Sequence, residues 1–168
     1  EPPAAEGGYL RDLTTGVDTR LGGAETGGAT VVRPVAITPS ASHALVHGGY
    51  GDLYLIDIEN STTVRADTNA DGAPADKGVV AKGAAVSADG RYVVFLSEAT
   101  NLVADPPEPF IEHVYLKDLE TGDVVRVSSN AATGEEGTGN SRHPVITGDA
   151  RFVLFPSYAQ NLTPLVQK

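Results

Sequence analysis

The sequence predicts an all-β protein made of short antiparallel strands, and three observations lead to this fold class. The 168 residues include 19 Gly and 11 Pro but only 6% aromatic residues, a composition that suits short strands and many turns. One motif of about fifteen residues is written three times. Between its copies lie short apolar runs bounded by turn sequences. A chain of this length can enclose one core, so we expect a single domain over residues 1–168.

The three copies of the motif share two charged positions. The copies are YLRDLTTGVDTRL from Tyr9, LYLIDIENSTTVRAD from Leu53 and VYLKDLETGDVVRVS from Val114. Each holds an Asp that is followed eight residues later by an Arg: Asp12 and Arg20, Asp57 and Arg65, Asp118 and Arg126. A fixed spacing indicates a structural repeat. We expect the aspartates either to cap the adjacent turn or to make a cross-strand contact, and the arginines to blunt exposed strand edges.

Each full repeat contains four strand-like runs. In the copy that shows them best, the runs cover residues 80–86, 91–96, 112–119 and 123–128. Four antiparallel strands in a repeat of this length are typical of a β-propeller blade. The sequence therefore predicts about three blades' worth of a propeller, divided into a partial blade (9–21), two whole blades (31–66 and 80–128) and a second partial blade (143–155).

The repeats also resemble a known family. The stretches VYLKDLETGDVVRVS, VSADGRYVVFLSEATNLV and ITGDARFVLFPSYAQNL resemble repeats of the TolB-like (WD-like) β-propeller family. The resemblance covers nearly the whole chain, and it implies an extracytoplasmic protein, either secreted or periplasmic. Two loops depart from the family pattern: TPSASH replaces the Asp-Gly turn in the first whole unit, and DPPEPFIEH replaces a polar stretch in the second.

The two partial blades are complementary halves of one blade. Residues 9–21 supply the third and fourth strands of a blade, and residues 143–155 supply the first and second. Joining them within one chain would give three blades, fewer than the four to eight that normally surround a channel. We expect half of a six-bladed ring, completed by a second copy or by the rest of a longer precursor, or an open arc that offers its strands to a different protein.

Composition excludes several classes of function. The net charge of −10 disfavours nucleic acid as a partner, and no apolar run approaches the roughly 20 residues of a membrane span. The absence of Cys excludes a thiol nucleophile, and no Ser-His-Asp spacing or GxSxG motif indicates a catalytic residue. The sequence favours a non-catalytic propeller module for protein or macromolecular binding and assembly. The alternative is an enzyme, or a carbohydrate- or anion-binding propeller, with a site at the channel mouth.

A basic side chain lies five residues before each of three recurring hydroxyl residues, Thr38, Ser87 and Thr147. The candidate anion-binding residues are these three basic positions and the histidine after the last: Arg33, Lys82, Arg142 and His143. At the entry to the innermost strands they would ring the channel mouth and attract a carboxylate or a phosphate. The alternative interpretation is a set of separate, solvated surface charges.

The stretch DTNADGAPAD is a candidate calcium loop. Asp67, Asn69 and Asp71 precede Gly72 with the alternation of oxygen ligands that Ca²⁺ prefers, and Asp76 follows. No Glu closes the loop at its twelfth position, so an Asn/Asp-Gly turn without a metal is the alternative.

Overall fold

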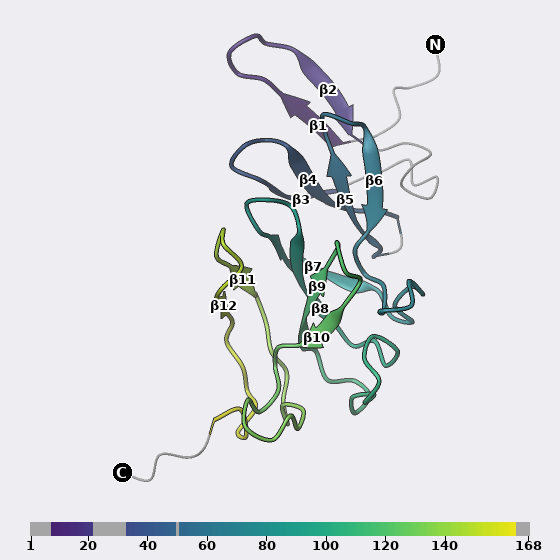
Figure 1. Cartoon of the computed structure of the whole chain (residues 1–168), viewed down its shortest axis with the longest axis vertical. Coiled ribbons are helices and arrows are strands. Elements are labelled where there is room, and N and C mark those ends of the chain that lie inside the picture. Colours follow the sequence, from purple (N-terminus) through teal and green to yellow (C-terminus); the bar gives the residue numbers. More distant parts are fainter. Residues whose placement is uncertain (1–7, 22–32, 50, 164–168) are drawn as a thin grey trace.

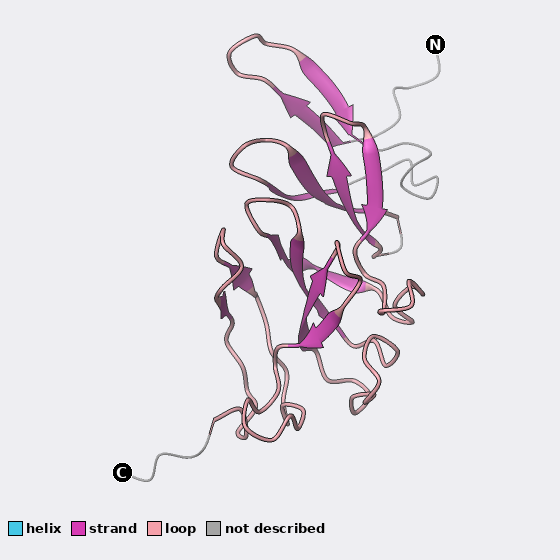
Figure 2. Cartoon of the chain, in the orientation of Figure 1, coloured by secondary structure: helices cyan, strands magenta, loops and turns pink. Residues whose placement is uncertain are grey.

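The computed structural model describes residues 8–21, 33–49 and 51–163, which form twelve strands and contain no helix (Figures 1 and 2). Two strands form an N-terminal hairpin: β1 (Gly8–Arg11) and β2 (Asp18–Leu21). The first blade contains β3 (Arg33–Ile37), β4 (His43–His47), β5 (Leu53–Asp57) and β6 (Thr62–Arg65). The second blade contains β7 (Val79–Val86), β8 (Tyr92–Ser97), β9 (His113–Asp118) and β10 (Val124–Arg126). A C-terminal hairpin consists of β11 (Val145–Ile146) and β12 (Val153–Leu154).

Each blade is an antiparallel sheet in which strands pair in chain order. The innermost strands β3, β7 and β11 contact one another in succession, as the inner strands of a propeller do. The sheets therefore follow one another along an arc, with the two hairpins at its opposite ends (Figure 1). None of the described residues belongs to a helix with the length and apolar character of a membrane span.

Apolar side chains between neighbouring sheets form the core. The cluster between the two blades joins Leu45, Leu53 and Leu55 to Phe95 and Tyr115. Phe95 and Tyr115 are fully buried and stack with ring centroids 5.9 Å apart. Because strands between two sheets are buried on both faces, β4, β5 and β8 read as nearly continuous apolar runs. Smaller clusters attach the N-terminal hairpin to the first blade and the C-terminal hairpin to the second.

The recurring aspartates cap the turn between the third and fourth strands, and this prediction is confirmed. The carboxylates of Asp12, Asp57 and Asp118 accept hydrogen bonds from backbone amides two or three residues ahead, at 2.7, 2.9 and 2.9 Å. The recurring hydroxyls close the turn between the first and second strands in the same way: Thr38, Ser87 and Thr147 each accept from the amide five residues on. The motif therefore repeats because each turn between a third and a fourth strand uses the same Asp cap.

The expected role of the arginine series is wrong for two of its three members. Arg65 lies in a partly buried ion-pair network, and Arg126 is only 7% exposed. Only Arg20, in the N-terminal hairpin, lies exposed on its strand. Arg65 and Arg126 turn inward because carboxylates in adjacent loops accept hydrogen bonds from their guanidinium groups: Asp52 and Asp67 for Arg65, and Asp105 for Arg126.

Candidate interaction site

The predicted anion-binding residues are only partly brought together. Arg142 and His143 precede β11 and line a cavity of about 60 Å³ with Glu112. Arg142 Nη2 lies 3.8 Å from Glu112 Oε2, so a carboxylate already faces this guanidinium. Arg33 begins β3, is exposed and is not among the residues that line the cavity. Lys82 belongs to β7, but its side chain lies outside the described part of the chain.

The residues of the predicted calcium loop have other partners. Asp67 is fully buried and paired with Arg65, and Asn69 Oδ1 accepts hydrogen bonds from turn amides, including that of Asp71. Asp76 accepts from the amide and hydroxyl of Thr100 at 2.8 and 2.7 Å. Within residues 8–21, 33–49 and 51–163, no three acidic or histidine side chains gather closely enough to hold a metal ion. Calcium binding stays a prediction.

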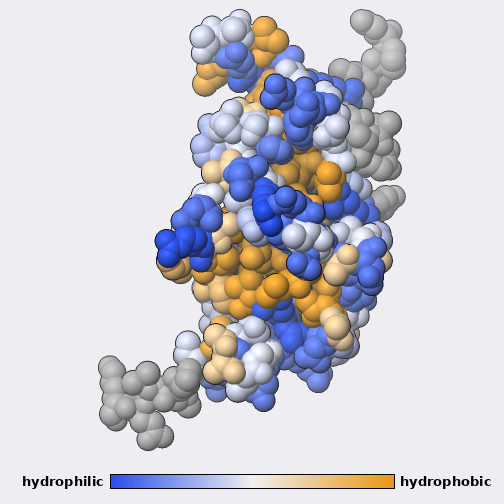
Figure 3. Space-filling model, viewed as in Figure 1, coloured by the Kyte–Doolittle hydropathy of each residue, from blue (hydrophilic) through white to orange (hydrophobic). Residues whose placement is uncertain are grey.

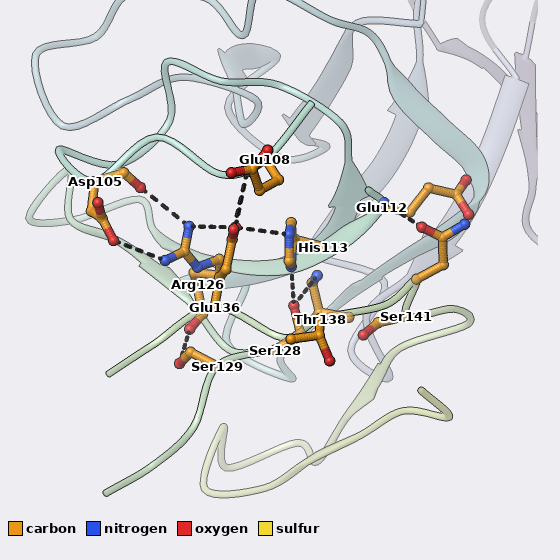
Figure 4. A network of polar contacts seen from close by, with 12 residues as sticks. Asp105, Glu108, Glu112, His113, Arg126, Ser128, Ser129, Glu136, Thr138 and Ser141 are labelled. Carbon is orange, nitrogen blue, oxygen red and sulfur yellow. Dashed lines mark hydrogen bonds and ion pairs between the residues drawn. The ribbon is translucent and has the colours of Figure 1, made fainter. Parts of the chain in front are cut away.

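Sequence reasoning missed a buried polar network in the second blade (Figure 4). His113 is fully buried; its Nδ1 lies 3.0 Å from Ser128 Oγ, and its Nε2 lies 3.4 Å from Glu136 Oε2. Arg126 Nη1 lies 3.7 Å from the same carboxylate oxygen. A serine, a histidine and a carboxylate thus lie together, as they do in many hydrolases. However, Ser128 is fully buried, and its Oγ accepts a hydrogen bond from the backbone amide of Val114. The arrangement holds β9 in place and offers no accessible nucleophile.

The repeat itself carried the signal for this network. Asp52, Arg65 and Asp67 of the first blade each precede a network residue by 61 positions: His113, Arg126 and Ser128. Asp67 Oδ1 accepts a hydrogen bond from the backbone amide of Leu53 at 3.0 Å, and Ser128 Oγ accepts the equivalent hydrogen bond from Val114 at 3.0 Å. Aligning the motif copies together with the one position before them would have placed these side chains together.

Acid is expected to destabilise the fold through His113. Burial, assisted by the nearby charge of Arg126 and opposed by Glu136, lowers the pKa of His113 below its ordinary value. Above about pH 6.5 both folded and unfolded chains carry the neutral ring, so full stability is present. Below that pH the unfolded chain binds the proton first, and the free energy of unfolding falls.

Urea unfolding at about pH 7.5 and about pH 5.5 measures the combined fall from His113 and from His47, whose pKa burial also lowers, and NMR titration of the His113 ring assigns the share of His113. The ring is expected to stay neutral at the lower pH. A normal titration of His113 in the folded chain would contradict the expectation.

The two terminal hairpins leave strand edges open. In the described ranges, β1 pairs only with β2 and β12 pairs only with β11, whereas every equivalent strand of the two blades has neighbours on both sides. Large apolar side chains are exposed beside these edges: Tyr9 is 55%, Phe152 62% and Leu154 72% exposed. Figure 3 shows a broad apolar surface over the second blade. Open edges with apolar flanks are typical of a strand-pairing interface, and we take them as the candidate interaction site.

Comparison with known proteins identifies the fold and nothing narrower. No protein-family model matches the sequence, and no curated protein matches it. Among solved structures, the chain is similar to the crystal structure of the tricorn protease, a β-propeller-containing protein, with a TM-score of 0.63 and 13% identity. The similarity covers 92% of this chain, which spans only 13% of that one. Together with the sheet order, it confirms the predicted fold class, an all-β partial propeller.

Proposed function

We propose that this chain is a non-catalytic β-propeller module that binds another protein by strand pairing at its incomplete blades. The observation that carries the proposal is the open edge of β12 beside an apolar cluster that is only partly covered. A free edge presents a row of unpaired backbone N–H and C=O groups, and an added strand satisfies them. On the resemblance to the TolB-like family, we place this function outside the cytoplasm.

The apolar cluster under the C-terminal hairpin is covered by strands on only part of its surface. Val94, Leu96 and Val114 form its buried centre, while Leu116 and Phe155 are only partly buried against it. The equivalent cluster between the two blades is sealed by the third strand of the second blade, and its aromatic side chains are fully buried. A third strand laid beside β12 would remove the remaining apolar surface from water, which supplies the affinity.

The alternative site at the channel mouth has less support. The cavity beside Arg142 and His143 is much smaller than the roughly 300–1,000 Å³ of most ligand pockets, and it contains the carboxylate of Glu112. A larger cleft of about 340 Å³ lies between the blades, lined by His43, Asp57 and Arg91 among others. The Arg91 guanidinium there is already held by Asp118 at 2.6 Å.

A peptide with the sequence from Gly8 to Leu21 tests the proposal, because it supplies a third and a fourth strand. We expect fluorescence anisotropy to show saturable binding of the labelled peptide to the full chain. Leu154→Lys should weaken it at least tenfold by placing a charge in the apolar contact. Val125→Lys, on the outer strand of the second blade, is the matched control and should leave binding unchanged. Equal binding of a scrambled peptide, or none of the native one, would overturn the proposal.

A further inference from the structure

We infer that the strand-pairing partner is a second copy of this chain, whose β1–β2 hairpin completes the blade that β11–β12 begins. This inference rests on the proposed function and specifies its partner. The two hairpins lie at opposite ends of the arc, separated by two whole blades, so they do not meet within one molecule (Figure 1).

The second blade provides the register of the missing pairing. The hydroxyl residues Ser87 and Thr147 align the chain from 92–95 with 152–155, and the recurring aspartates align 115–118 with 9–12. Within the second blade, Tyr92 pairs with Asp118 and Phe95 with Tyr115. The same register across two molecules sets Phe152 opposite Asp12 and Phe155 opposite Tyr9. Backbone pairing of this kind repeats what already holds β8 to β9.

The register places a basic side chain, Arg151, beside an acidic one, Asp12 of the other molecule. In the second blade, Arg91 Nη2 lies 2.6 Å from Asp118 Oδ2, and this contact lowers the pKa of Asp118 to about 2. Arg151 is the equivalent of Arg91, and its guanidinium lies 5.3 Å above the ring of Phe152, much as that of Arg91 lies 5.0 Å above Tyr92.

Asp12, the aspartate that is expected to pair with Arg151, has the same local structure as Asp118. Asp12 caps its turn through the amide of Thr14, as Asp118 caps its own through Glu120. No ion pair of Arg151 occurs among the described residues, so its charge is available to an Asp12 from a second molecule. The pairing would reproduce a contact that the fold already uses once.

The apolar contacts of the missing pairing fit as well. Tyr115 faces the cluster between the blades and stacks on Phe95. Tyr9, its equivalent, would cover the open cluster under the C-terminal hairpin, where Phe155 already packs. On the opposite face, Leu10 packs against the first blade and stands in register with Leu154, which is 72% exposed. Both exposed side chains, Tyr9 and Leu154, would become buried.

Two copies satisfy each other completely. Each offers one first-and-second-strand hairpin and one third-and-fourth-strand hairpin, so a two-fold axis creates two identical contacts and pairs both of the hairpins that the structure describes. The product has six blades, within the range of four to eight that surrounds a channel.

Charge exchange across the predicted pair tests the inference by light scattering on the full chain. Wild type is expected at twice the 17.4 kDa of one chain. Asp12→Arg and Arg151→Asp each set like charges against each other at both contacts, and each should weaken association by about a hundredfold. An equal mixture of the two variants restores one native and one reversed ion pair, so it should recover the doubled mass. Glu59→Arg, at an exposed position in the turn between β5 and β6, is the control for charge alone.

The outcomes separate this inference from the proposed function. A mass of one chain at every concentration, with binding of the Gly8–Leu21 peptide retained, would overturn the second copy as partner and leave strand pairing standing. Loss of both would overturn both. Single variants that keep the doubled mass, or a mixture that fails to recover it, would overturn the inferred register.

Discussion

Replacing Arg65 by Ala is expected to destabilise the chain by about 3–5 kcal/mol, because it leaves a buried carboxylate without its cation. Asp67 has no exposed surface, and it receives two hydrogen bonds from the Arg65 guanidinium, at 3.0 and 2.9 Å. The same guanidinium binds Asp52 at 2.7 Å and thereby ties the loop before β5 to the end of β6. Without it, Asp67 must either bind a proton or pull the strand end into water.

The repeat supplies a matched control for this variant. Arg20 occupies the equivalent position in the N-terminal hairpin, where it is exposed, so Arg20→Ala should change the free energy of unfolding by less than about 0.5 kcal/mol. Urea unfolding of both variants measures the difference. Equal effects of the two substitutions would show that the arginine series acts at the surface after all.

Replacing Lys117 by Met is expected to cost about 3 kcal/mol, because three backbone carbonyls lose their donor. Lys117 is 4% exposed, and its Nζ donates to the carbonyl oxygens of Thr68, Asn69 and Gly122 at 3.2, 2.9 and 2.7 Å. Two of these carbonyls belong to the loop that leaves the first blade, so this ammonium joins the two blades. Met keeps the length and volume of the side chain, so the loss reports on the hydrogen bonds.

Lys77→Met is the control for Lys117, since Lys77 is exposed at the end of the same inter-blade loop. It should leave the urea midpoint unchanged. In native-state hydrogen exchange, Lys117→Met should speed exchange in residues 66–76 before it affects the second blade. An unchanged midpoint for Lys117→Met would mean that water replaces the ammonium without penalty.

Much of the fold could be predicted because the repeat encodes its turns. Asp118 and Ser87 are short-range signals: each caps a turn a few residues away, so spacing along the chain reflects spacing in the structure. The complementary end hairpins were also predictable, since they follow from counting strands. The assignment to the TolB-like family stays a prediction, because the structural similarity supports the propeller fold alone.

The site residues were harder to predict because they depend on long-range contacts. Irregular pairing at Pro34/Ala36 in the first blade and at Val79/Ala84 in the second shifts the register of the inner strands, so an equal distance from the hydroxyl does not by itself define equivalent positions. A ring of cations at the channel mouth stays a prediction. The Glu136 carboxylate, which contacts His113 and Arg126, lies in a loop after β10, where no periodic sequence pattern indicates its position.

Hydrogen–deuterium exchange at the two open strands tests whether the incomplete blades bind by strand pairing. We expect slow exchange in residues 151–155 and 8–12 at high concentration of the chain, and fast exchange on dilution. Adding the Gly8–Leu21 peptide to the dilute chain should again protect residues 151–155. Fast exchange of both segments under all of these conditions would contradict strand pairing, because the open edges would then have no partner strand.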